Sequence, residues 1–188
     1  MFGKPATAIT TFDWCGLRSG MIYHLIYHHS LALHVNHLVF LNTYLFGIWL
    51  LLAAADPIAG WAAAAAYAVY ATALAGPLGG LFGLLQVAAA YGATALHTAL
   101  LTDGGGWAPW EVVMLGVGLV LGSFMAQLAG HASSEAFIAP PHLFHGFVAA
   151  PILEWVGLAF RLGALPALRR DVLAEVATAR GSAAALLS

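Results

Sequence analysis

Two short stretches of this sequence hold nearly all of its histidines. Nine histidines outnumber the six lysines and arginines, and only His97 lies outside residues 24–37 and 131–145. The two stretches contain His24, His28, His29, His34, His37, His131, His142 and His145. Neutral imidazole is the commonest side-chain metal ligand, and imidazole with carboxylate suits iron, zinc, copper or nickel. The residue types therefore indicate a metal site.

The spacing of these residues supports the same interpretation. Residues three or four positions apart share one face of a helix, so each such pair can present two side chains to one point. The pairs are His24 with His28, His34 with His37, His131 with Glu135, and His142 with His145, and Gln127 lies one turn before His131.

Composition predicts the environment of this site. Hydrophobic residues make up 62% of the 188 residues and charged residues 7%, against about 25% charged in soluble domains. The mean hydropathy is +0.88. We expect an all-α, polytopic membrane helical bundle with four to five transmembrane segments, formed as a single integral membrane domain over 1–188. The only cysteine, Cys15, excludes a CxxC site, and a net charge of −2 argues against nucleic-acid binding.

Turn signals divide the chain into segments. "DP" at 56–57 and "GPLGG" at 76–80 are typical helix breaks. We expect an N-terminal helix over 12–30, spans near 34–55, 58–75, 78–101 and 111–135, a fifth segment over 143–163 that spans or is re-entrant, and a surface tail over 167–188.

Positive charge predicts the orientation. Lys4 and Arg18 precede the first span and Arg161, Arg169 and Arg170 come at or after the last segment, whereas the loops at 56–57 and 102–109 hold no basic residue. The positive-inside rule then places both termini on the cytoplasmic side, which requires an even number of crossings. The start of the first span and the end of the fourth meet on that side, and the two histidine stretches converge there.

Some polar residues have a plainer interpretation when each is taken singly. His24, His34 and His97 are typical of interfacial anchors or of hydrogen bonds between helices. Glu154 could pair with Arg161 or face water.

Three segments carry a resemblance. "YHHSLALHVNH", "QLAGHASSEAFIAPP" and "AAPILEWVGLAFRLG" resemble the small membrane-embedded, iron-dependent 2-hydroxy fatty acid dioxygenases of fatty acid alpha-oxidation. The chain departs from that family's pattern in having Ser30-Leu31 where Asn-Pro is usual, and no basic residue after Glu135. The matching positions are Tyr27, His28, His29, His37, Gln127, Gly130, His131, Glu135, Ala150, Pro151, Phe160, Arg161, Leu162 and Gly163.

The resemblance implies an Fe(II) cofactor, O2 and a fatty-acyl substrate that loses one carbon through cleavage between carbons one and two. Gln127 is expected as a hydrogen-bond donor beside the metal, and Glu135 as a ligand or the partner of one. The implied metal ligands are His28, His29, His37 and His131, with His142 and His145 next in line. We expect the site near the cytoplasmic face of a bacterial inner membrane; the oligomeric state is left open.

Two alternatives stay open. "HLIYHH" and "HLFH" are similar to the boxes of di-iron membrane hydroxylases and desaturases, which would hold two irons per chain instead of one. A non-enzymatic metal-binding, transport or structural membrane protein is the other. A metal carrier needs a polar path, and the middle spans offer little beyond Gln86, Tyr91 and His97.

Overall fold

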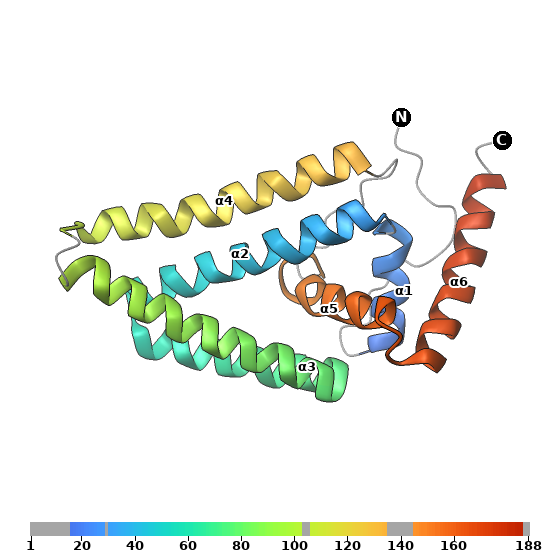
Figure 1. Ribbon diagram of the computed structural model, residues 1–188, viewed down its shortest axis with the longest axis horizontal. Coiled ribbons are helices and arrows are strands. Elements are labelled where there is room, and N and C mark those ends of the chain that lie inside the picture. The colour runs from blue at the N-terminus through green and yellow to red at the C-terminus, as the bar shows by residue number, and fades with distance from the viewer. Residues whose placement is uncertain (1–15, 29, 103–105, 135–144, 186–188) are drawn as a thin grey trace. The chain divides into compact units, whose positions relative to one another are not determined.

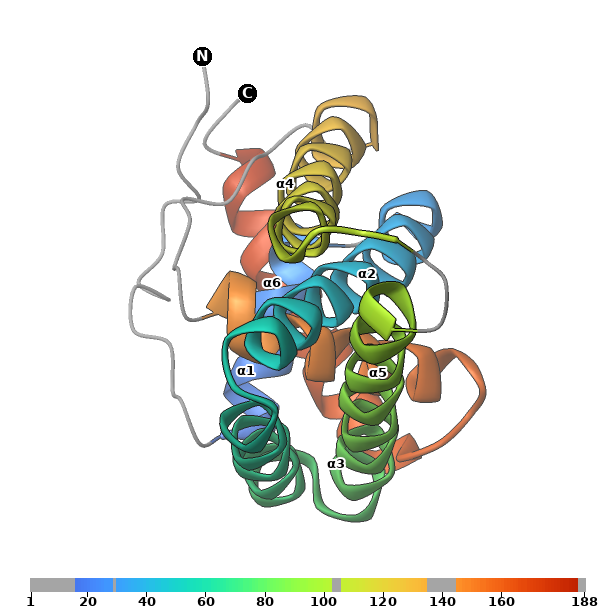
Figure 2. The same ribbon diagram turned by 90° about the vertical axis from the view of Figure 1, so that its left-hand side faces the viewer.

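The computed structural model describes residues 16–28, 30–102, 106–134 and 145–185, and this part of the chain is helical without a strand (Figures 1 and 2). The all-α fold class is thereby confirmed. The elements are α1 (Leu17–Tyr27), α2 (Leu31–Ala55), α3 (Pro57–Thr102), α4 (Pro109–Ser134), the π-helix η1 (His145–Ala149), α5 (Ala150–Arg161) and α6 (Pro166–Ala185).

Several of these helices are apolar and long enough to cross a membrane. Among the described residues α2, α3 and α4 meet this condition, with mean hydropathies of 2.0, 1.6 and 2.0 in their most apolar windows. The pair formed by His145–Arg161 and Pro166–Ala179 meets it jointly but is bent by 108°. A helix needs about 20 mostly apolar residues to cross the hydrocarbon core, so the chain has the helices of an integral membrane protein.

Helix α3 is folded back on itself. Its backbone leaves helical geometry at Ala75 and at Gly76, whose φ of +59° suits glycine. The indole nitrogen of Trp61 donates to Thr94 Oγ1 over 3.2 Å, although a straight helix would separate these residues by about 50 Å. The element is therefore a hairpin of two arms, 57–74 and 77–102, and the break between them lies at the start of the "GPLGG" segment.

Glycines allow the two arms to approach closely. A Cβ atom added at Gly79 would lie 1.8 Å from the carbonyl oxygen of Ala71, and one added at Gly83 would lie 2.7 Å from Ala68 Cα. Small residues at such contacts are the usual means by which helices associate in lipid.

The described chain divides into two compact units, 39–127 and the combination of 1–38 with 128–188. In the 39–127 unit, α2 and α4 run antiparallel, since Gly47 lies against Leu119 and Gly116 lies against Leu51. The buried amide of Gln86 ties α3 to α2 in the same unit: it accepts from Trp49 Nε1 and donates to Asn42 Oδ1, both over 3.1 Å.

The other unit contains the two histidine stretches and is called the terminal unit below. Helix α1 packs against α5 and α6, and Arg18 forms an exposed ion pair with Glu175 of α6. The core of the terminal unit contains fully buried apolar side chains, among them Met21, Leu33 and Ile152, together with buried histidines and one buried glutamate.

Candidate metal centre

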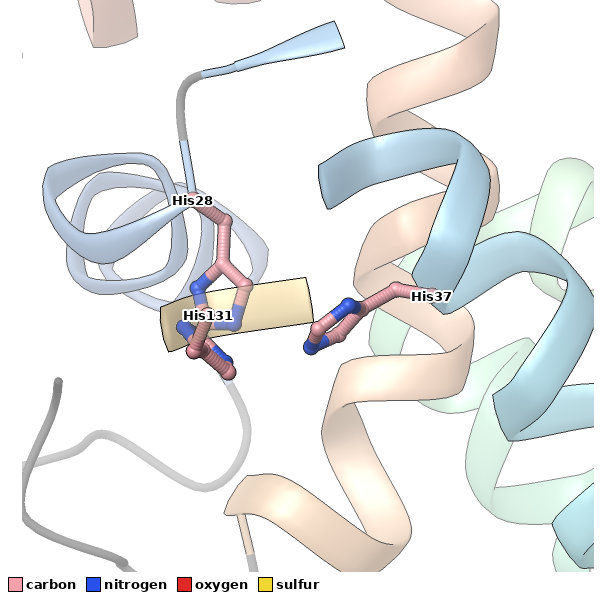
Figure 3. A group of neighbouring side chains, drawn as sticks. All are labelled: His28, His37 and His131. Atoms are coloured by element: carbon pink, nitrogen blue, oxygen red, sulfur yellow. The ribbon is translucent and has the colours of Figure 1, made fainter. Parts of the chain in front are cut away.

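Three histidines from three helices converge in the terminal unit (Figure 3). His28 ends α1, His37 lies in the second turn of α2, and His131 lies in the last turn of α4. Their ring centroids are 4.8 to 4.9 Å apart, and one ring nitrogen from each lies within 4.8 Å of the others. His28 and His37 are buried and His131 is half-buried. We call these residues the three-histidine group.

The antiparallel packing of α2 and α4 accounts for two of these positions. In the terminal unit, a Cβ atom added at Gly130 would lie 2.8 Å from the Asn36 side chain. His131 and His37 are the next residues along the two helices, and their ring centroids are 4.9 Å apart. Gly130 makes this close approach possible because any larger residue would displace Asn36.

Local hydrogen bonds set the orientation of two of the rings. His28 Nδ1 lies 3.0 Å from the His24 carbonyl oxygen, and His37 Nδ1 lies 3.1 Å from the Leu33 carbonyl oxygen. A carbonyl only accepts, so each Nδ1 must carry the proton and donate it. The Nε2 lone pair of each ring is then left to bind a metal, and metal-ligating histidines are typically held in this way. The residues present therefore fit a metal ion.

The charge state of His28 also suits this role. Burial lowers its pKa well below 6.5, and His24 and His37 lower it further because charged neighbours would repel an imidazolium. The ring is neutral at physiological pH, which is the form that binds metals.

A buried carboxylate adjoins the three-histidine group. Glu154 Oε1 lies 3.1 Å from His24 Nε2, and Glu154 Oε2 pairs with His34 Nδ1. The His24 ring stacks on the His28 ring with centroids 4.3 Å apart. His24, His28 and Glu154 thus form a second group able to hold a metal.

The expectation that Glu154 pairs with Arg161 or faces water is wrong. Its side chain is only 1% exposed, and its ionic partners among the described residues are His24 and His34. The reason is that α5 turns this carboxylate inward, against α1 and the first turns of α2. Sequence reasoning missed it as a site residue, although Glu154 is the only carboxylate between residues 136 and 170 and an ionisable group in so apolar a segment indicates function.

The other expected site residues are placed less centrally or lie elsewhere. His145 begins η1, with its ring centroid 5.5 Å from that of His24 and 6.4 Å from that of His28, so it borders the three-histidine group. Gln127 lies on α4 one turn before His131, within the 39–127 unit, as does His97 on α3. His29, Glu135 and His142 lie outside the described residues.

No protein-family model, curated protein or solved structure matches this chain.

Proposed function

We propose that this protein is a membrane-embedded, Fe(II)-dependent oxygenase that shortens 2-hydroxy fatty acids by one carbon. One observation carries the proposal: His28 and His37 each commit Nδ1 to a backbone carbonyl and keep Nε2 for a ligand beside His131. These three residues also occupy positions at which the sequence resembles the 2-hydroxy fatty acid dioxygenases.

The ligand set is compatible with iron, zinc, copper or nickel, and the resemblance to iron-dependent dioxygenases selects iron for this proposal. Three imidazoles leave open coordination positions on any metal that they hold, as non-haem Fe(II) sites of oxygen chemistry also do. Bound Fe(II) would supply O2 activation next to a hydroxy acid that can chelate it through its hydroxyl and carboxylate oxygens. The overall reaction balances without another reductant: the 2-hydroxy acid and O2 yield the shortened acid, CO2 and water, with four electrons passing from carbons one and two to O2.

The residues of the chain hold and orient the ligands. Backbone carbonyls fix the His28 and His37 rings, and the pair formed by His24 and Glu154 supports the face of the His28 ring. His28 and Glu154 are buried, and burial away from water strengthens the interactions between charged groups within the site.

The alternative with two irons has one observation in its favour, the second group of His24, His28 and Glu154. Both groups need His28, however, and its Nδ1 is occupied by the His24 carbonyl. One ring nitrogen cannot ligate two separate ions, so the arrangement favours one iron per chain. A metal carrier would need free polar groups along a path through the spans. The buried amide of Gln86 is not free, because it is hydrogen-bonded to Trp49 and Asn42 of α2.

The proposed orientation follows from charge. All six basic residues belong to the terminal unit, and the 39–127 unit contains none. The positive-inside rule then favours a location of the terminal unit and its histidines at the cytoplasmic face of a bacterial inner membrane.

The test uses purified protein loaded anaerobically with Fe(II). We expect about one iron per chain, O2 uptake with 2-hydroxyhexadecanoate but not with hexadecanoate, and pentadecanoate as the product by mass spectrometry. His131→Ala should lose both iron and turnover while its circular dichroism stays helical, and His97→Ala serves as the matched control. Full iron content in His131→Ala would contradict the proposal, and two irons per chain would favour the di-iron alternative.

A further inference from the structure

A separate cavity of about 410 Å³ opens within the terminal unit beside the metal centre. Its wall is formed by α1, the start of α2, α5 and α6, and most of that wall is apolar. Pockets of roughly 300–1,000 Å³ are the size that holds a small ligand. None of His28, His37 and His131 lines the cavity, so it is distinct from the three-histidine group.

Two arginines lie on the wall of this cavity. Arg161 is the last residue of α5, and Arg169 lies in the first turn of α6. The 108° bend between these helices, with positive φ angles at Gly163 and Leu165, brings the two guanidinium-bearing residues to one cavity.

The charge around these arginines is unbalanced. None of the described residues that line the cavity is acidic, and none of the described residues forms an ion pair with either guanidinium group. An arginine presents several N–H donors in a fixed fork that matches a carboxylate bidentately. The cavity therefore complements an anion.

The rest of the wall complements a hydrocarbon chain. Leu25, Phe160 and Leu173 line it, and the adjoining Leu162 is 78% exposed at the end of α5. Exposed leucines next to arginines are typical of a helix end at a membrane interface, where the charges stay at the surface and the apolar groups reach into the lipid.

We propose that this cavity binds a fatty acid anion, with its carboxylate on Arg161 and Arg169 and its single chain along Leu25, Phe160 and Leu173. A single-chain ligand is favoured over a phospholipid because the two acyl chains of a phospholipid would need about twice the hydrocarbon volume in the same cavity. The inference goes beyond the proposed function and needs no metal. His34 links the cavity to the buried carboxylate, because it lines the cavity and pairs with Glu154.

The experiment measures equilibrium binding of radiolabelled dodecanoate to the full chain in phosphatidylcholine nanodiscs, with binding to empty nanodiscs subtracted. We expect saturable binding that Arg161→Gln and Arg169→Gln each weaken at least about tenfold. The reason is that a hydrogen bond to a charged group typically increases binding affinity by about tenfold or more. Arg170→Gln is the matched control, since Arg170 is an exposed neighbour that does not line the cavity. Ala177→Phe should block binding by filling the cavity.

Other outcomes would overturn the inference. If dodecanol bound as tightly as dodecanoate, the arginines would not be recognising a carboxylate. If Arg170→Gln weakened binding as much as Arg161→Gln and Arg169→Gln, the effect would come from general surface charge and not from the cavity. Preferential displacement by phosphatidylglycerol would assign the cavity to a phospholipid headgroup. His131→Ala should bind dodecanoate normally, so a failure of the proposed iron chemistry would leave this result unchanged.

Discussion

His24 and Glu154 face each other in the interior of the terminal unit, with Nε2 and Oε1 3.1 Å apart and 1% of each side chain exposed. The second carboxylate oxygen pairs with His34. A buried carboxylate is costly unless its partners compensate it, so α1, α2 and α5 are joined here by polar contacts that depend on one another.

Replacing Glu154 with alanine should therefore damage both stability and metal binding. Two buried imidazoles would lose their shared partner, and breaking such a pair typically costs about 3–5 kcal/mol. Glu154 holds the His24 ring that stacks on the His28 ring, so its loss should also weaken metal affinity about 10–100-fold. Thermal unfolding and metal titration in detergent measure the two effects.

The matched control for this prediction is Glu175→Ala. Glu175 also pairs with a basic residue, Arg18, but both side chains are about half exposed, and exposed pairs contribute at most about 1 kcal/mol. Equal effects of the two substitutions would show that burial of Glu154 does not matter.

The lowered pKa of His28 predicts how stability of the metal-free protein depends on pH. The unfolded chain binds a proton near pH 6.5, whereas burial keeps the folded ring neutral to well below that value. This contribution to stability is fully present above pH 6.5 and is lost as the pH falls toward the folded pKa. We expect the melting temperature to drop below pH 6.5, and less steeply in His28→Asn. Parallel curves for the two proteins would contradict the assignment to His28.

The sequence predicted the features of the site that depend on the order and direction of the helices. It did not predict the features that depend on the direction in which each side chain points. Four antiparallel segments bring the start of α2 to the end of α4, and this is why His37 and His131 could be expected to converge. Glu154 could not be paired in advance, because its partners on α1 and α2 depend on how α5 is rotated. The spacing of His24 and His28 places both on one helix face but does not show that their rings stack.

The hairpin of α3 gives a prediction about packing. Gly79→Ala would place a methyl group within 1.8 Å of the Ala71 carbonyl oxygen, so the arms would have to separate. Such overpacking typically costs about 1–3 kcal/mol. We expect a lower melting temperature for Gly79→Ala and an equal or higher one for Gly92→Ala, because nothing lies within 4 Å of a Cβ atom at Gly92 and alanine favours the helix. Equal stability of the two variants would argue against close contact between the arms.

Binding of a metal to the three-histidine group should itself stabilise the fold. A ligand at 100 times its Kd adds about 2.7 kcal/mol to the free energy of unfolding, and this ligand would link α1, α2 and α4 through His28, His37 and His131. Fe(II) should raise the melting temperature of the wild-type protein, and a chelator should reverse the change.

Single substitutions identify which histidines produce this shift. His37→Ala and His131→Ala should abolish it, because each removes one of three ligands. His97→Ala should retain it, because His97 lies on α3 in the other unit. His145→Ala should also retain most of it, since that ring only borders the group, at 6.4 Å from His28. A shift lost in His145→Ala but kept in His37→Ala would move the centre toward η1 and away from α2.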